Sequence, residues 1–158
     1  AKDKEIAPVV GGSANFRNFI KDELIPEITK KYRTTKEKGI IGESLSGLFV
    51  METFMQTPEL FDFYIAFDPS LWWNNHYLVR NAKESLAKLP AEQKRLWFAG
   101  SSAGDISVHT NGLAKVLEKE SPKTLVWKYS DEPKEEHSTI FRATKVKALE
   151  WCLGKEGI

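Results

Sequence analysis

The chain of 158 residues contains one cysteine, little net charge and no long apolar run. Its single cysteine, Cys152, excludes an internal disulfide and leaves the redox compartment, and with it the localisation, undecided. Cys152 lies in an apolar stretch, so we interpret it as a buried structural thiol. The formal net charge of +1 gives no reason to expect a nucleic-acid partner. No apolar run approaches the roughly 20 residues of a membrane span, so we expect no membrane partner either.

Histidine is also scarce, and its three positions limit the chemistry that the chain can carry. No two of the histidines fall at ligand spacing with a cysteine or a carboxylate, so we expect no metal site and no cofactor. His76 follows two asparagines and is interpreted as part of a loop or of the rim of the site. His109 lies four residues after Asp105, which an ordinary local pair explains. His137 is therefore the histidine that we consider for catalysis.

What is present is the composition of an ordinary folded domain, with 41% hydrophobic and 28% charged residues. We expect residues 1–158 to form a single domain with its own core. Expected strands alternate with expected helices, which predicts an α/β fold with a mostly parallel sheet and right-handed crossovers. The strands are expected near 38–43 and at 63–67, 95–100 and 124–128. The helices are expected from Ser13, with an interruption at Pro26, after the first strand to Gln56, and at 77–89, 111–119 and 139–153.

The stretch 38–50 is the one around which the chain is organised. An apolar segment runs into a glycine-flanked serine and then into an apolar helix, which is the order of a nucleophile elbow. Ser44 stands at the tip of the turn, where the strained backbone requires small neighbours two positions away. Gly42 meets this requirement, and Ser46, which stands where the pattern has glycine, nearly does. The pattern predicts Ser44 as a nucleophile and the Leu45 backbone N–H as a donor to a developing oxyanion.

A base and an acid are expected further along the chain. His137 lies between the last strand and the last helix, from where an imidazole can reach the elbow serine; it could also be a solvated histidine in an acidic loop. Asp105 follows the third strand in a small-residue loop, and the chain order Ser44, Asp105, His137 is that of this fold. We therefore predict that Asp105 orients His137, although it could instead cap the next helix. A Ser–His dyad without a fixed acid stays open, and the acid could also be one of Asp131, Glu132, Glu135 and Glu136.

Trp72 and Trp73 follow the strand at 63–67. Adjacent tryptophans there can form an aromatic wall for an acyl or aryl group of a substrate. They can also serve packing alone, and we expect one of them in the core and the other over the loop. Ligands of open α/β sheets bind at the carboxyl ends of the strands. Because the elbow, this loop, Asp105 and His137 each follow a different strand, we expect them to converge there.

Several segments resemble a known family in the same order along the chain. They are Gly11-Gly12 through Leu24-Ile25-Pro26, Lys31-Tyr32-Arg33-Thr34, the elbow, Pro58-Glu59-Leu60-Phe61 and Asp68-Pro69-Ser70-Leu71-Trp72-Trp73-Asn74. Together they are similar to the putative-esterase branch of the α/β-hydrolases, which includes esterase D-like proteins and enterochelin-type siderophore esterases. The resemblance implies a serine hydrolase with Ser44 as nucleophile and His137 as base, and a small-molecule ester as its partner. It supports Asp105 less firmly, because members differ in how the acid is supplied.

The sequence departs from the family pattern at two positions of the elbow. Ser46 replaces a glycine, and Glu43 stands where histidine is frequent. A carboxylate at Glu43 could disfavour anionic substrates, stabilise the cationic form of His137, or point away into a salt bridge. Besides ester hydrolysis through an acyl-enzyme, two functions remain open. One is acyl transfer to an acceptor that is not water, and the second is binding or assembly without turnover.

Residues 1–37 contain one expected helix and no convincing strand, whereas this fold has several strands before the elbow. The resemblance, too, covers the later part of the family's domain. The second oxyanion donor comes from the earlier part, and nothing in residues 1–37 can be assigned to it. We therefore expect one portion of a longer polypeptide, with an unpaired edge on the elbow strand. Such a chain is expected to dimerise, swap strands or require its missing half, and to catalyse poorly alone.

Overall fold

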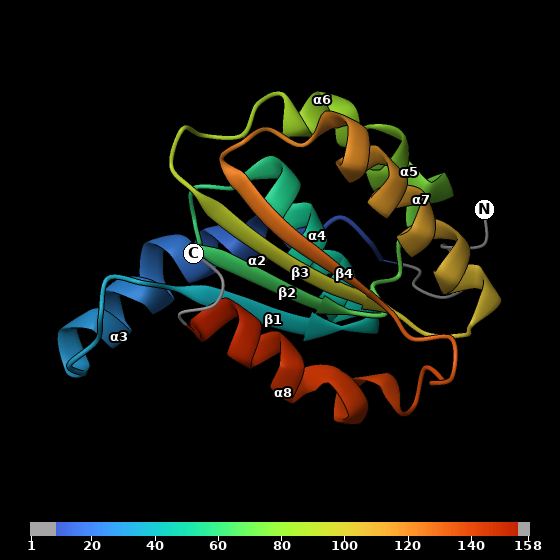
Figure 1. Cartoon of the computed structure of the whole chain (residues 1–158). Coiled ribbons are helices and arrows are strands. Elements are labelled where there is room, and N and C mark those ends of the chain that lie inside the picture. The colour runs from blue at the N-terminus through green and yellow to red at the C-terminus, as the bar shows by residue number, and fades with distance from the viewer. Residues whose placement is uncertain (1–8, 155–158) are drawn as a thin grey trace. The chain divides into compact units, whose positions relative to one another are not determined.

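Four parallel strands form one sheet in the computed structural model, which describes residues 9–154 (Figure 1). Each strand pairs with the one before it in the chain, so the order across the sheet is β1-β2-β3-β4. The strands are β1 (Gly39–Glu43), β2 (Phe63–Phe67), β3 (Lys94–Gly100) and β4 (Leu125–Asp131). The α/β class and the parallel sheet predicted from the sequence are therefore confirmed.

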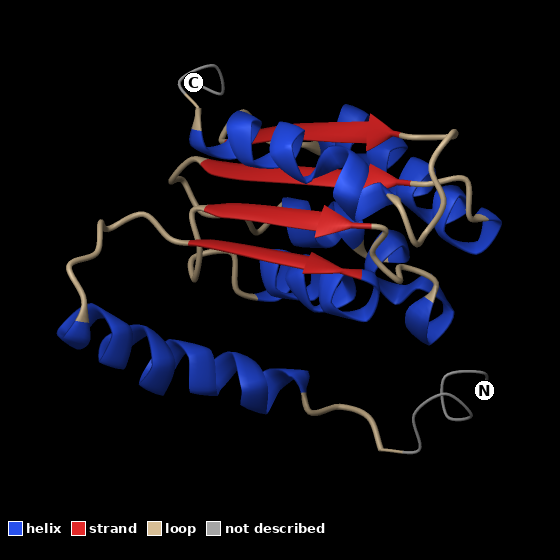
Figure 2. Cartoon of the chain, turned by 90° about the horizontal axis from the view of Figure 1, so that it is seen from below, coloured by secondary structure: helices blue, strands red, loops and turns tan. Residues whose placement is uncertain are grey.

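Helices cover both faces of this sheet (Figures 1 and 2). One face is covered by α8 (Ile140–Leu153), drawn in red in Figure 1. The other face is covered by α4 (Ser44–Gln56), α5 (Trp73–Arg80), α6 (Ala82–Leu86) and α7 (Gly104–Glu120). The crossovers between successive strands thus share one face, and the carboxyl ends of all four strands meet at one edge.

The core lies on both sides of β2 and β3. These strands are apolar on both faces because both faces are covered, as is usual for a parallel sheet. The cluster under α8 comprises Ile65, Phe67, Trp97, Ala99, Ile140, Ala148 and Cys152. Cys152 is fully buried there, so the prediction of a structural thiol is confirmed.

The described residues fall into two compact units that divide after Lys38. The described part of the first unit, residues 9–38, contains α2 (Ser13–Phe19), the π-helical η1 (Ile20–Leu24) and α3 (Ile25–Lys31). The interruption expected at Pro26 is present: because proline donates no N–H, the regular α-helix gives way to a π-turn just before it. Ser13 is the first helical residue rather than the N-cap, which is Gly12.

The prediction of a single helix at 77–89 is wrong. The chain forms α5 and α6 there, and α5 contains a left-handed turn. The backbone angle φ is 51° at Asn74, 53° at Asn75 and 46° at His76. Asparagine tolerates this conformation better than most residues, because its short amide bonds to local backbone groups. The loop after β2 is therefore more tightly folded than its sequence indicated.

Two other elements are longer than expected. Helix α7 begins at Gly104 instead of Asn111, and its buried residues keep helical spacing from Ile106 onward. Strand β4 continues to Asp131, because β3 provides a partner for it along its whole length. Both extensions place residues that we expected in loops inside regular structure.

Strand β1 lies at one edge of the described sheet, where it pairs with β2 alone. The side chain of Ile41 on this strand is 46% exposed. The unpaired edge expected for the elbow strand is thus observed within the described residues. None of the helices between residues 9 and 154 has the length and apolar character of a membrane span.

Candidate active site

Ser44 lies at the junction of β1 and α4 in a strained turn. Its φ is 57°, in the left-handed region that residues other than glycine rarely occupy. A Cβ atom on Gly42 would lie 2.5 Å from the carbonyl oxygen of Ser46, so only glycine fits there. A Cβ atom on Gly47 would lie 3.1 Å from Pro69 Cα, so this glycine lets α4 approach the loop after β2. The local geometry is that of a nucleophile elbow.

Ser46 and Glu43 form a reciprocal cap at the start of α4. Ser46 Oγ accepts the backbone N–H of Glu43 at 2.9 Å and donates to its carbonyl oxygen at 2.7 Å. The Glu43 side chain in turn accepts the backbone N–H of Ser46. The negative charge therefore lies at the positive end of the helix dipole. Capping was not among the roles that we considered for Glu43. That its carboxylate disfavours anionic substrates stays a prediction.

His137 bridges the elbow serine and an acid. Its side chain lies in the loop between β4 and α8 and is 43% exposed. Its Nε2 is 3.1 Å from Ser44 Oγ, and its Nδ1 is 2.9 Å from Asp68 Oδ2. Because a carboxylate can only accept, the proton belongs on Nδ1, which leaves Nε2 free to accept the serine proton. The structure thus brings Ser44 and His137 together in the arrangement that their roles require.

Asp68 directly follows β2, and its side chain is completely buried. Its Oδ1 accepts the backbone N–H of Ser101 at 2.6 Å, and its Oδ2 accepts the Ser101 hydroxyl at 2.6 Å in addition to His137. These three donors offset the cost of burying the carboxylate. Its φ of 42° is strained for a residue that precedes proline, and the bond from its N–H to Ala99 O holds this turn in place.

Asp105 does not occupy the position that we expected for it. Because α7 begins at Gly104, Asp105 lies in the first turn of a helix, where its exposed carboxylate suits the helix dipole. The acid on His137 Nδ1 is Asp68, from the strand next to the elbow strand. The sequence did carry a signal for it, namely an acid immediately after an apolar strand, although that segment was interpreted only as a family motif.

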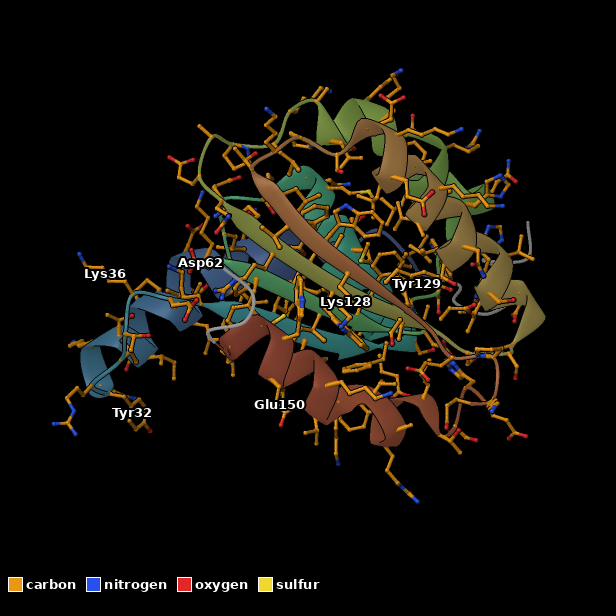
Figure 3. The ribbon with its side chains drawn as sticks, viewed as in Figure 1. Tyr32, Lys36, Asp62, Lys128, Tyr129 and Glu150 are labelled. Carbon is orange, nitrogen blue, oxygen red and sulfur yellow. The ribbon has the colours of Figure 1, made fainter. Side chains whose placement is uncertain are left out.

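Two of the four acids that were alternatives to Asp105 have other contacts. Asp131 accepts a bond from the hydroxyl of Tyr129, and Glu132 accepts bonds from Ser130 and Lys147. Burial raises the pKa of Tyr129, labelled on β4 in Figure 3, to about 12, so its phenol stays neutral. These contacts fix β4 and the loop after it.

Trp72 and Trp73 contact each other at the start of α5, with ring centroids 5.6 Å apart. Both are half-buried, so the expectation that one of them packs into the core is wrong. The core position of this segment is taken by Leu71, which is fully buried. The segment is joined to the elbow, since the backbone N–H of Ser70 donates to the Ser44 carbonyl oxygen at 3.1 Å.

His76 and His109 form a second pair of titratable groups on this side of the sheet. Their rings stack with centroids 5.0 Å apart, and His76 lies within α5 rather than in a loop. The pKa of His109 is lowered, first by burial and then by the neighbouring His76, while Asp105 opposes this shift. Within residues 9–154, no group of three or more histidine, cysteine or acidic residues is placed to hold a metal ion.

The family model described as "Putative esterase" matches residues 1–147 of this chain. Ferri-bacillibactin esterase BesA of Bacillus subtilis is 34% identical over 105 residues, which cover 65% of this chain and 35% of that protein. The siderophore triacetylfusarinine C esterase of Aspergillus fumigatus is 32% identical over 80 residues, or 49% of this chain and 27% of that protein.

Solved structures match over a larger share of the chain. The crystal structure of the BES protein from Bacillus cereus superimposes with a TM-score of 0.81 at 26% identity. That match covers 90% of this chain and 55% of the Bacillus cereus protein. The chain therefore spans about a third of the length of the Bacillus subtilis relative and about half of this solved structure.

Proposed function

Because the chain belongs to the family described as "Putative esterase", we propose that it is a serine hydrolase that cleaves carboxylic esters through an acyl-enzyme. One observation carries this proposal. A continuous hydrogen-bonded chain runs from Ser44 Oγ through His137 to the buried Asp68, with Ser44 on a left-handed turn. This combination is the arrangement by which a serine is activated as a nucleophile.

Ser44 Oγ attacks the acyl carbon while His137 Nε2 takes the hydroxyl proton. Asp68 keeps the second imidazole proton on Nδ1 and stabilises the imidazolium that forms. His137 then donates the proton to the leaving alkoxide, and the acyl group stays on Ser44. In the second half of the reaction, His137 deprotonates a water molecule that attacks the acyl-enzyme. His137 then returns this proton to Ser44 Oγ as the bond to the acyl group breaks and the acid is released. We thus propose Asp68 as the triad acid in place of Asp105.

The developing oxyanion is expected at the N-terminus of α4. Leu45 is the second residue of this helix, so its N–H is among the donors that a helix leaves without an internal partner. The helix dipole strengthens this donor. The Glu43 carboxylate caps the same turn, so we expect neutral or cationic esters to be preferred over anionic ones.

The substrate side is formed by Trp72 and Trp73. Their half-buried rings lie at the start of α5, in the segment whose backbone bonds to the elbow. They are tilted by 49° to each other and offer apolar ring surface to an acyl or aryl group. Relatives named as esterases of ferri-bacillibactin and of the siderophore triacetylfusarinine C support a siderophore ester as the natural substrate class.

A fluorophosphonate probe tests the nucleophile, because it reacts with an activated serine and stays attached. We expect the probe on the Ser44 peptide of the wild-type chain, and no labelling of Ser44→Ala. His137→Ala should slow labelling by a factor on the order of 10³, because base and nucleophile act as a unit. Ser46→Gly, which restores the usual elbow pattern, is the matched control and should still be labelled.

Two results would contradict the proposal. One is an unlabelled wild-type chain at neutral and mildly alkaline pH, which would favour a binding or assembly domain on this fold. The other is labelling that persists in Ser44→Ala, which would place the reactive group elsewhere.

A further inference from the structure

The loop between β3 and α7 carries two serines that contact both halves of the proposed relay. Ser101 is 1% exposed and donates to Asp68 twice, from its N–H to Oδ1 and from its hydroxyl to Oδ2, both at 2.6 Å. Its hydroxyl oxygen also accepts the backbone N–H of Ala103 at 3.2 Å, which fixes the rotamer of the donor. The carboxylate is therefore held at both oxygens.

The next residue holds the segment that bears His137. Ser102 donates to the carbonyl oxygen of Glu135 twice, from its N–H at 2.9 Å and from its hydroxyl at 2.8 Å. Glu135 lies two residues before His137 in the loop that follows β4. A further bond, from the N–H of Glu132 to the carbonyl oxygen of Gly100 at 2.9 Å, connects the start of this loop to the end of β3.

We propose that Ser101 and Ser102 are positioning residues, of which Ser101 fixes the carboxylate of Asp68 and Ser102 holds the loop that carries His137. The inference rests on the proposed function. Neither serine touches the reacting atoms; each acts through a residue that does. A loop of two adjacent serines thereby sets the separation between acid and base, which come from different strands.

This arrangement accounts for the small residues after β3. The sequence Ser101-Ser102-Ala103-Gly104 leads into α7, and its small side chains predict a loop that lets Asp105 turn inward. In the structure, the loop instead brings two hydroxyl groups to opposite sides, one facing β2 and one facing the loop after β4.

The direct readout is the tautomer of His137, measured from the ¹⁵N shifts of its two ring nitrogens in the full chain. In the wild type, Asp68 should hold the proton on Nδ1. Ser101→Ala removes the hydroxyl donor to Asp68 Oδ2 and keeps the backbone N–H bond to Oδ1. Because Oδ2 is the oxygen that faces His137, we expect a mixture of tautomers and a loss of about 10- to 100-fold in fluorophosphonate labelling rate, the range of a hydrogen bond to a charged group. Ser101→Thr keeps the hydroxyl and should restore the Nδ1 tautomer.

Ser102→Ala loses a hydroxyl bond to a neutral carbonyl oxygen, whereas Ser101→Ala loses one to a carboxylate, so we expect a smaller loss of labelling rate than in Ser101→Ala. Ser107→Ala is the control, because Ser107 is a half-buried serine of α7 that supplies no hydrogen bond to Asp68 or Glu135 among the described residues. If Ser101→Ala does not fold, Ser101→Cys replaces it, since a thiol of similar size is a weak donor.

The inference is overturned if neither serine variant differs from Ser107→Ala. That result would be the same His137 tautomer and the same labelling rate in Ser102→Ala, in Ser101→Ala (or its substitute Ser101→Cys) and in Ser107→Ala. This failure is distinguishable from failure of the proposed function. A wild-type chain that resists labelling contradicts the esterase proposal, whereas the tautomer comparison still decides whether the serines position His137.

Discussion

Asp68 illustrates how a buried carboxylate can be supplied with hydrogen-bond donors in the interior. It accepts two bonds from Ser101 and one from His137, so each of its oxygens has a partner. Hydrogen bonds to a charged group contribute about 1.5–3 kcal/mol each, which is enough in sum to balance burial. The acid is thus fixed by Ser101 and presents Oδ2 to the imidazole.

Exchanging the two candidate acids for amides separates their roles. Asp68→Asn should lower the kcat of aryl-ester hydrolysis by a factor on the order of 10³–10⁴, because an amide cannot hold the proton on Nδ1 or stabilise the imidazolium. Asp105→Asn should stay near the wild type, because its side chain is exposed in the first turn of α7. If the two variants rank in the opposite order, Asp105 is the acid after all.

Among these residues the sequence predicted Ser44 and His137 as partners but not Asp68. The elbow is a local pattern, since its glycine and serine spacing follows from the backbone of a single turn. The identity of the acid depends on how far the loops after β2 and β3 reach across the sheet edge. For the loop after β3, that distance is set by where α7 begins, and this helix begins at Gly104 without a capping side chain that the sequence would reveal.

Among the helices and strands, the parallel sheet could be predicted from the alternation of the two, because parallel strands require crossovers. The left-handed turn at Asn74–His76 could not. Three successive residues with positive φ are too rare for any propensity to indicate. This turn starts α5 and brings His76 against His109 of α7.

The burial of His109 on α7, and second its neighbour His76 on α5, should make stability depend on pH. The pKa of His109 is lowered from 6.5 in the folded chain, so below this pH the unfolded chain binds a proton that the folded chain takes up only at lower pH. The free energy of unfolding should therefore decrease as the pH falls from 6.5 toward the lowered pKa, and should not respond to His109 above this window.

Urea unfolding at a series of pH values in the wild type and in His109→Gln measures this effect. In His109→Gln, the free energy of unfolding should decrease less below pH 6.5 than it does in the wild type. His137→Gln, in the loop after β4, is the histidine variant measured alongside it. Equal pH dependence in the wild type and His109→Gln would show that the histidine stack does not couple to folding.

Taken as a whole, the chain spans 35% of the Bacillus subtilis relative and 55% of the Bacillus cereus structure. Convergence at the carboxyl edge was predictable, because the topology directs every βα loop to the same side. Residues from three loops meet there in the structure: Ser44 after β1, Asp68 after β2 and His137 after β4. The β3 loop contributes Ser101 and Ser102 rather than the predicted acid.

The proposed mechanism requires that Ser44 carries the acyl group during ester hydrolysis. Mixing the full chain with a short aryl ester, quenching in acid during turnover and locating the acyl group by peptide mass spectrometry tests this requirement. We predict an acyl group on the Ser44 peptide of the wild type and none in Ser44→Ala. In Asp68→Asn, the ratio of acylated Ser44 peptide to hydrolysis rate should be higher than in the wild type, because deacylation also requires the base. Hydrolysis that proceeds at the wild-type rate in Ser44→Ala, or an acyl group found on another residue, would contradict the mechanism.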